Sequence, residues 1–193
     1  MTLKPDVVDP LVLPAAPAVS LDIEDIYYAH VAQVTRWVGR LAGPGHEVED
    51  LVQEVFLRVH RRLSSFRGES QLSTWIYAIT ENVVRARRRS ERLRRLCSGG
   101  PSLDDLQLRA PGPTPLEALE RRRSNALIYA ALDGLAEKYR TLFILFEIEG
   151  LPGEQIALYT GISVATVWVR LTRARAKLAA RLERLEKRTV SRG

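Results

Sequence analysis

Apolar residues recur at steps of three and four along most of the chain beyond residue 20, and this spacing restricts the possible fold more than any other feature. Side chains spaced in this way lie on one face of a helix. One such stripe contains Val48, Leu51, Val52, Val55 and Val59, and another contains Val167, Leu171, Ala174 and Leu178. No segment shows the alternation of apolar and polar residues that is typical of a strand. We therefore predict an all-α fold.

Clusters of glycine and proline divide this helical pattern at residues 43–45, 97–115 and 150–153. Such clusters mark turns and loops, and the longest of them has the composition of a linker. We predict two small helical domains joined by a flexible linker, the C-terminal one a helix-turn-helix. The expected parts are a disordered tail at 1–20, an N-terminal domain at 21–96, the linker at 97–115, a C-terminal domain at 116–186 and a tail at 187–193.

The net charge of +6 is unevenly distributed. Residues 61–95 contain ten arginines against three acidic residues, and residues 163–193 contain nine basic residues against two acidic ones. An acidic segment precedes each of these two basic segments. A basic helix face that meets a polyanion would account for both. Ordinary solvated helix surface is the plainer alternative, but the repetition favours a polyanionic partner.

Several classes of protein do not fit the sequence. No apolar stretch is long enough to span a membrane, and we expect no signal peptide. Cys97 is the only cysteine, which fits a reducing compartment. The three histidines, His30, His46 and His60, lack the spacing of metal ligands, and no glycine-rich phosphate loop is present. We expect a cytoplasmic protein that is not an enzyme and requires no metal and no cofactor.

The segment from Glu154 to about Leu182 has the order of elements found in a helix-turn-helix: a short helix, a turn containing Gly161, and a longer basic helix that Ser163 can cap. The second helix of such a motif lies in the major groove of DNA. Thr166, Arg170 and Arg173 share one face of that helix. The segment therefore predicts DNA binding, with an ordinary helical hairpin as the alternative.

Three parts of the chain together resemble a known family. The segment DLVQEVFLRV at 50–59 is similar to the polymerase-binding helix of the extracytoplasmic-function (ECF) group of bacterial RNA polymerase sigma factors. The segment FRGESQLSTWIYAI at 66–79 resembles their promoter-melting loop and helix. The segments at 150–157, 161–167 and 170–175 resemble their C-terminal helix-turn-helix. The order along the chain is also that of the family.

The resemblance implies an alternative sigma factor that binds core RNA polymerase, recognises two promoter elements and opens promoter DNA. An anti-sigma factor is a further expected partner. The residues expected to bind polymerase are Asp50, Gln53, Glu54 and Arg58. Those expected at single-stranded promoter DNA are Phe66, Arg67, Ser70, Ser73 and Asn82, and those at the upstream duplex and its phosphates are Arg85, Arg88 and Arg89. The expected helix-turn-helix contacts are Thr166, Trp168, Val169, Arg170 and Arg173.

The chain departs from the usual family pattern at four of its positions. Glu81 and Ala86 stand where the family often has arginine and aspartate. Trp168 and Val169 stand where a basic residue and a serine usually precede Arg170. We therefore expect an altered promoter preference. One hypothesis is that Trp168 or Val169 contacts thymine methyl groups, and another is that Trp168 packs against a partner.

Three other functions compete with this interpretation. The chain could be a helix-turn-helix transcription regulator with no polymerase-binding role, although residues 50–79 argue against that. An enzyme acting on nucleic acid lacks support from any motif. A structural helical adaptor leaves the two basic segments unexplained.

The charge distribution predicts that binding to duplex DNA weakens steeply with salt. Each phosphate neutralised by lysine or arginine contributes about −0.9 to the slope of log affinity against log salt concentration. A fluorescence anisotropy titration of a labelled duplex over a salt series measures that slope. A flat response would contradict the prediction.

Overall fold

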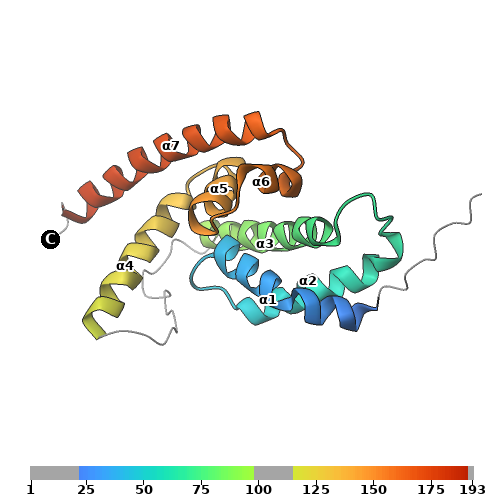
Figure 1. Ribbon diagram of the computed structural model, residues 1–193. Coiled ribbons are helices and arrows are strands. Elements are labelled where there is room, and N and C mark those ends of the chain that lie inside the picture. The colour runs from blue at the N-terminus through green and yellow to red at the C-terminus, as the bar shows by residue number, and fades with distance from the viewer. Residues whose placement is uncertain (1–21, 98–114, 191–193) are drawn as a thin grey trace, which may run out of the picture.

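The computed structural model describes residues 22–97 and 115–190, and all elements within these ranges are helical (Figure 1). The first range contains α1 (Ile23–Ala42), α2 (Val48–Arg62), the short 3-10 helix η1 (Leu63–Ser65) and α3 (Leu72–Cys97). The second contains α4 (Pro115–Leu132), α5 (Glu137–Phe143), the π-helical turn η3 (Ile144–Ile148), α6 (Gly153–Thr160) and α7 (Val164–Val190). The predicted all-α class is confirmed.

The predicted N-terminal tail at 1–20 and most of the predicted linker lie outside the described residues. Cys97 is the last residue of α3 and Pro115 the first of α4. α7 extends to Val190, beyond the predicted start of the C-terminal tail, of which residues 191–193 also lie outside the described part. In the part that is described, no helix is both long and apolar enough to cross a membrane.

α1, α2 and α3 pack together as a three-helix group with a continuous apolar interior. Asp22 begins α1 by accepting a hydrogen bond from the Glu24 backbone N–H at 3.0 Å, as helix-capping aspartates do. The predicted stripe of α2 is confirmed at Leu51, Val52, Val55 and Val59, which are buried together with Phe56, whereas Val48 is half-buried. Val34, Trp37, Ile76 and Tyr77 complete the centre of this group.

α4 to α7 form the second group, which contains the predicted helix-turn-helix. Gly161 ends α6 in the left-handed region, at φ +66°, where glycine lacks the steric penalty of other residues. Ser163 Oγ accepts a hydrogen bond from the Thr166 backbone N–H at 3.2 Å, so the predicted cap of α7 is present. The predicted stripe of Val167, Leu171, Ala174 and Leu178 is buried.

The segment after α5 differs from the regular helix that the sequence predicted. Its backbone widens into the π-helical turn η3, where the Glu149 N–H donates to the Ile144 carbonyl at 2.9 Å. Within this turn Ile144 and Leu145 are buried, whereas Phe146 is half-buried. The wide turn inserts an extra residue and so rotates the following side chains.

The two helical groups lie against each other, with α5 and α6 between α7 and α3 (Figure 1). At their junction the Trp37 ring meets Tyr77 and Tyr159 edge-to-face, with centroids 5.2 and 5.4 Å away. The Tyr77 and Tyr159 rings stack at 4.7 Å. Burial raises the pKa of Tyr77 well above its ordinary value, so its hydroxyl stays neutral. The two helical groups therefore share an apolar core and do not lie apart from each other.

Arg140 of α5 is fully buried at this junction, which the sequence did not predict. Its guanidinium donates to the Leu41 carbonyl at 2.6 Å and to the Ala42 carbonyl at 3.5 Å. These carbonyls belong to the last turn of α1, where no partner exists within the helix. Burial lowers the pKa of Arg140 to about 10, so it remains charged at neutral pH. The second group thus caps a helix of the first.

Gly43 allows a second contact between the two helical groups, again at the end of α1. It follows α1 at φ +87°, and a Cβ atom there would lie 2.7 Å from the Tyr129 ring of α4. The Tyr129 hydroxyl donates to the Arg40 carbonyl at 3.1 Å. Both the turn and the close approach of Tyr129 therefore require glycine.

We predict that Arg140→Met lowers the free energy of unfolding by about 2–4 kcal/mol, because it leaves buried carbonyls without donors. Urea denaturation followed by tryptophan fluorescence measures the change. Arg173→Met removes the same group from an exposed position of α7 and should have little effect. Equal urea midpoints for the two variants would contradict the assigned role of Arg140.

Candidate nucleic-acid interface

One side of α3 presents polar groups to solvent. Asn82 and Arg89 are seven residues apart, two helical turns, and both are exposed. Ala78 and Ala86 lie on the same side and are also exposed, so no bulky residue shields Asn82. The polar groups of Asn82 and Arg89 are therefore accessible from solvent on this face.

The adjacent side of α3 faces the second helical group. Arg88 donates to both carboxylate oxygens of Glu137, at 2.7 and 2.8 Å, and to Asp133 at 2.9 Å. Its side chain is only 13% exposed. Arg85 pairs with Glu81 at 2.6 Å. Of the three arginines predicted at duplex DNA, Arg89 is therefore exposed, the paired side chain of Arg85 is 39% exposed, and Arg88 is largely enclosed.

The loop between η1 and α3 contains most of the residues predicted to bind single-stranded DNA. Arg67 and Ser70 are exposed, whereas Phe66 and Ser73 are half-buried. The Phe66 ring packs on Trp75 at 5.2 Å between centroids. This ring pair supports the loop at the start of α3.

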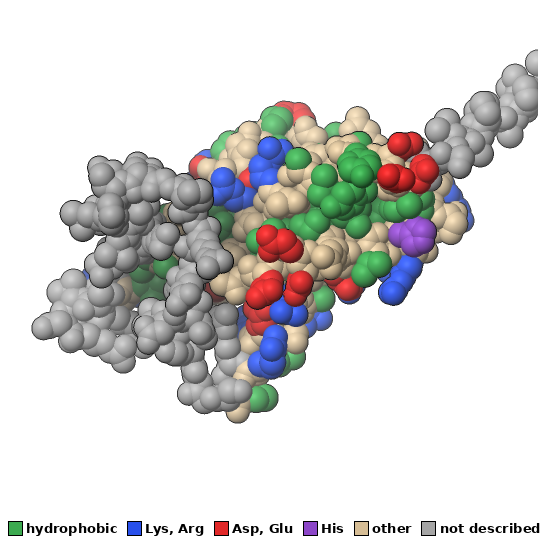
Figure 2. All heavy atoms as spheres, turned by 90° about the horizontal axis from the view of Figure 1, so that it is seen from below, with side chains coloured by type: hydrophobic (Ala, Val, Ile, Leu, Met, Phe, Trp, Pro, Cys, Tyr) green, Lys and Arg blue, Asp and Glu red, His purple; other side chains and the backbone are tan. Residues whose placement is uncertain are grey.

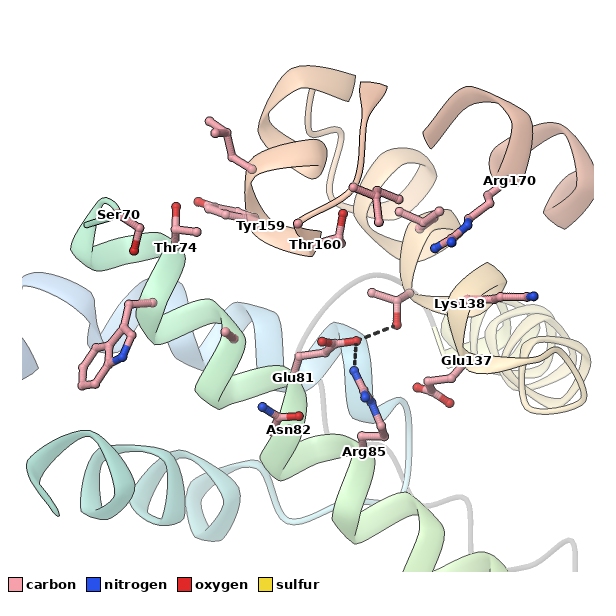
Figure 3. Close-up of a pocket in the computed structure, with 17 residues that line it drawn as sticks. Ser70, Thr74, Glu81, Asn82, Arg85, Glu137, Lys138, Tyr159, Thr160 and Arg170 are labelled. Carbon is pink, nitrogen blue, oxygen red and sulfur yellow. Dashed lines mark hydrogen bonds and ion pairs between the residues drawn. The ribbon is translucent and has the colours of Figure 1, made fainter. Parts of the chain in front are cut away.

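A hollow of about 670 Å³ lies between α3, α5, α6 and the start of α7 (Figure 3). It brings Ser70, Asn82, Arg85 and Arg170 to one site, although they belong to three separately predicted sets. Figure 3 shows Glu81 on the wall, bonded to Arg85 and to Thr141. Glu81 and Glu137 place acidic groups among these basic ones. The hollow is far too small for a duplex.

The outward face of α2 presents the residues predicted to bind polymerase. Asp50 and Gln53 are exposed. Glu54 and Arg58 bond to each other at 2.7 Å, one turn apart. These four residues form a polar surface on the far side of α2 from its buried stripe.

Sequence reasoning missed a set of exposed apolar side chains on α1 and α2, formed by Tyr27, Tyr28 and Leu57. Leu57 is 52% exposed and Tyr28 is 71% exposed, and Tyr27 packs edge-to-face on Phe56 at 4.8 Å. Figure 2, which looks onto the side of α1 and α2, shows hydrophobic side chains gathered next to acidic ones. An apolar centre with a polar rim is the usual anatomy of a protein–protein interface. The sequence feature that could have revealed them is Leu57, an apolar residue that falls outside the buried stripe of α2.

The predicted contacts of the helix-turn-helix occupy different sides of α7. Val169 and Arg173 are exposed, whereas Arg170 lines the hollow. Thr166 shares a hydrogen bond with Ser163 at 2.8 Å. The Trp168 ring packs edge-to-face on Phe146 at 5.2 Å. Nowhere in residues 22–97 or 115–190 does a group of histidine, cysteine and acidic residues form a candidate metal site.

Comparisons with known proteins agree with this geometry. Residues 26–95 match the family model of sigma-70 region 2, and residues 125–178 match that of sigma-70 region 4. The ECF RNA polymerase sigma factor SigW of Bacillus subtilis is 32% identical over 169 residues, which cover 85% of this chain and 89% of SigW. SigE of Mycolicibacterium smegmatis, also an ECF sigma factor, is 32% identical over 80% of this chain, which spans 59% of SigE.

A solved structure has the same fold. The sigma factor RpoE of Bartonella quintana, in complex with the anti-sigma factor NepR, superimposes with a TM-score of 0.58 at 23% identity. The match covers 84% of this chain and 97% of that one.

The chain belongs to the ECF group of bacterial RNA polymerase sigma factors. It is an alternative sigma factor, and sigma factors are in general non-enzymatic initiation factors that bind DNA. Since both regions are present in order, a helix-turn-helix regulator without a polymerase role is not favoured.

The pairing of Arg88 with Glu137 predicts that Glu137→Gln raises affinity for duplex DNA about fivefold, ~1 kcal/mol, because it leaves Asp133 as the only carboxylate that competes with phosphate for Arg88. Glu154→Gln is the matched control, since Glu154 also lies in the first turn of a helix and is exposed. Fluorescence anisotropy with a random-sequence duplex measures both variants. Equal affinities for the two variants would show that Glu137 does not hold Arg88 away from DNA.

Proposed function

We propose that this sigma factor docks on core RNA polymerase through α2 and delivers it to two promoter elements, one at α3 and one at α7. The observation that carries the proposal is the presence of two separate basic helices and an exposed apolar cluster in one chain. Asp50, Gln53, Glu54 and Arg58 would form the polar rim of the polymerase contact. Leu57, with Tyr27 and Tyr28, would supply its apolar centre.

Promoter opening is assigned to the loop before α3 and to the exposed side of α3. Arg67, Ser70 and Asn82 are exposed and would contact the separated strand. Phe66 and Ser73, both half-buried, would line the pocket for an unstacked base, with the Phe66–Trp75 pair as its support. Arg89 is the arginine that meets upstream phosphates first.

The closed arrangement of the two groups would open during initiation. Opening would separate Arg88 from Glu137 and Asp133 of the second group, and DNA phosphates would replace those carboxylates. Arg85 pairs with Glu81 of its own helix, so phosphate would have to compete with that pair in either arrangement. Arg170, now in the hollow, would be released together with Arg88. Thr166, Trp168, Val169, Arg170 and Arg173 are the proposed helix-turn-helix residues.

We further propose an anti-sigma partner, supported by the complex of the structural neighbour RpoE with NepR. The exposed apolar cluster of Tyr27, Tyr28 and Leu57 is a suitable surface, because one protein covering it would block polymerase. The sigma factor itself would catalyse no reaction and would act in the cytoplasm together with polymerase.

In vitro transcription with bacterial core polymerase and a promoter library tests the proposal and identifies both promoter elements.

Leu57→Asp should abolish retention of core polymerase in a pull-down while leaving duplex DNA binding intact, because it places a charge in an apolar contact. Leu93→Asp, which changes an exposed leucine of α3, is the matched control and should retain core polymerase.

Arg89→Ala should instead retain core polymerase and weaken initiation. If the wild-type chain neither retains core polymerase nor initiates transcription, the proposal is wrong. DNA binding without polymerase would then favour the helix-turn-helix regulator.

A further inference from the structure

The outward face of α7 is made of small apolar groups. Residues of a helix are rotated by about 100° from one to the next, so Val169 lies opposite the buried stripe of Val167 and Leu171. Val169 is 51% exposed. Ala165, Thr172 and Ala176 lie on the same side and are exposed. The centre of this face therefore presents methyl groups, with Arg173 at its edge.

The hydroxyl groups near this face already take part in hydrogen bonds within the protein. Thr172 Oγ1 donates to the Trp168 carbonyl at 3.1 Å, which directs its polar hydrogen into the helix. Thr166 and Ser163 share the hydrogen bond that caps α7. Apart from the arginines at its edge, this face therefore offers few polar hydrogens for hydrogen bonds to base edges, which makes an apolar contact the main one available at Val169.

Trp168 lies on the flank of α7, where it is 42% exposed and packs part of its ring against other parts of the same group. Its ring meets Phe146 edge-to-face, at an interplanar angle of 80°, and Arg175 lies over the same Phe146 ring at 5.5 Å. A Cβ atom at Gly153 would be 2.8 Å from the Trp168 ring, so the start of α6 is fitted closely around it. Trp168 is therefore suited to holding α6 and η3 at a set angle to α7.

We propose that Val169 is a specificity-determining residue, which recognises the 5-methyl group of a thymine in the element bound by the helix-turn-helix, and that Trp168 is a positioning residue. The inference rests on the proposed promoter contact of α7. In the major groove only thymine carries a methyl group among the four standard bases. A valine without donors or acceptors distinguishes bases through that group.

Replacing thymine with deoxyuridine tests this inference, since the exchange removes only the methyl group. Each thymine of the element selected from the promoter library is exchanged in turn, and the affinity of the sigma factor–core polymerase holoenzyme is measured. At one position the wild-type holoenzyme should lose about fourfold, the change expected for one buried methyl group, about 0.8 kcal/mol. Holoenzyme that carries Val169→Ala should bind the thymine promoter and the deoxyuridine promoter equally well.

Two variants separate the role of Trp168 from that of Val169. Trp168→Ala should weaken all promoters by the same factor and keep the deoxyuridine effect, because it displaces the whole helix. Trp168→Phe should restore affinity, since an aromatic ring can still pack on Phe146. A change in base preference with Trp168→Phe would overturn the positioning role.

The inference on Val169 is wrong if the selected element contains no thymine. It is also wrong if Val169→Ala keeps the deoxyuridine effect. In both of these cases transcription from the library still proceeds. Failure of the proposed function is different, because no promoter would then support initiation with the wild-type chain.

Discussion

The contact on which the arrangement most depends is the charged guanidinium of Arg140 at the end of α1. Two carbonyls of α1 receive its hydrogen bonds, although 99 residues separate Arg140 from Leu41 in the chain. A buried charge without partners would be costly, so the two helical groups are held at the distance that satisfies it. The stacked aromatic rings of Trp37, Tyr77 and Tyr159 fill the space around the same junction.

Because of this junction, some of the residues of α3 that are predicted to bind DNA are accessible from solvent and others are not. Asn82 and Arg89 on α3 are exposed in the closed arrangement, whereas Arg88 is held by carboxylates of the second group. The carboxylates of Glu137 and Asp133 are 36% and 47% exposed, so salt or another polyanion can compete with them for Arg88, whereas the apolar junction does not respond to charge. Promoter DNA could therefore displace Glu137 and Asp133, while separation of the groups also requires a partner that compensates for the aromatic junction.

Features that depend on nearby residues were predictable from sequence, and features that depend on distant ones were not. The stripes of α2 and α7, the Gly161 turn and the Ser163 cap each involve residues close together in the chain. The burial of Arg140 could not be predicted, because its partners lie in another helical group. Leu57 was missed for a different reason, since a single apolar residue on a surface is ordinary. The sequence left Trp168 with two possible roles, and its contact with Phe146 depends on the unpredicted turn η3.

That π-helical turn contacts both α1 and α7 through side chains that are neighbours in sequence. Glu149 pairs with Arg36 and Arg40 of α1, while Glu147 pairs with Arg175 of α7 and Phe146 meets Trp168. The extra residue of the turn sets the direction of all three side chains at once. Point substitutions there can alter one contact at a time, but a one-residue deletion between 144 and 148 would turn them all out of register. This segment should therefore tolerate a changed side chain better than a changed length.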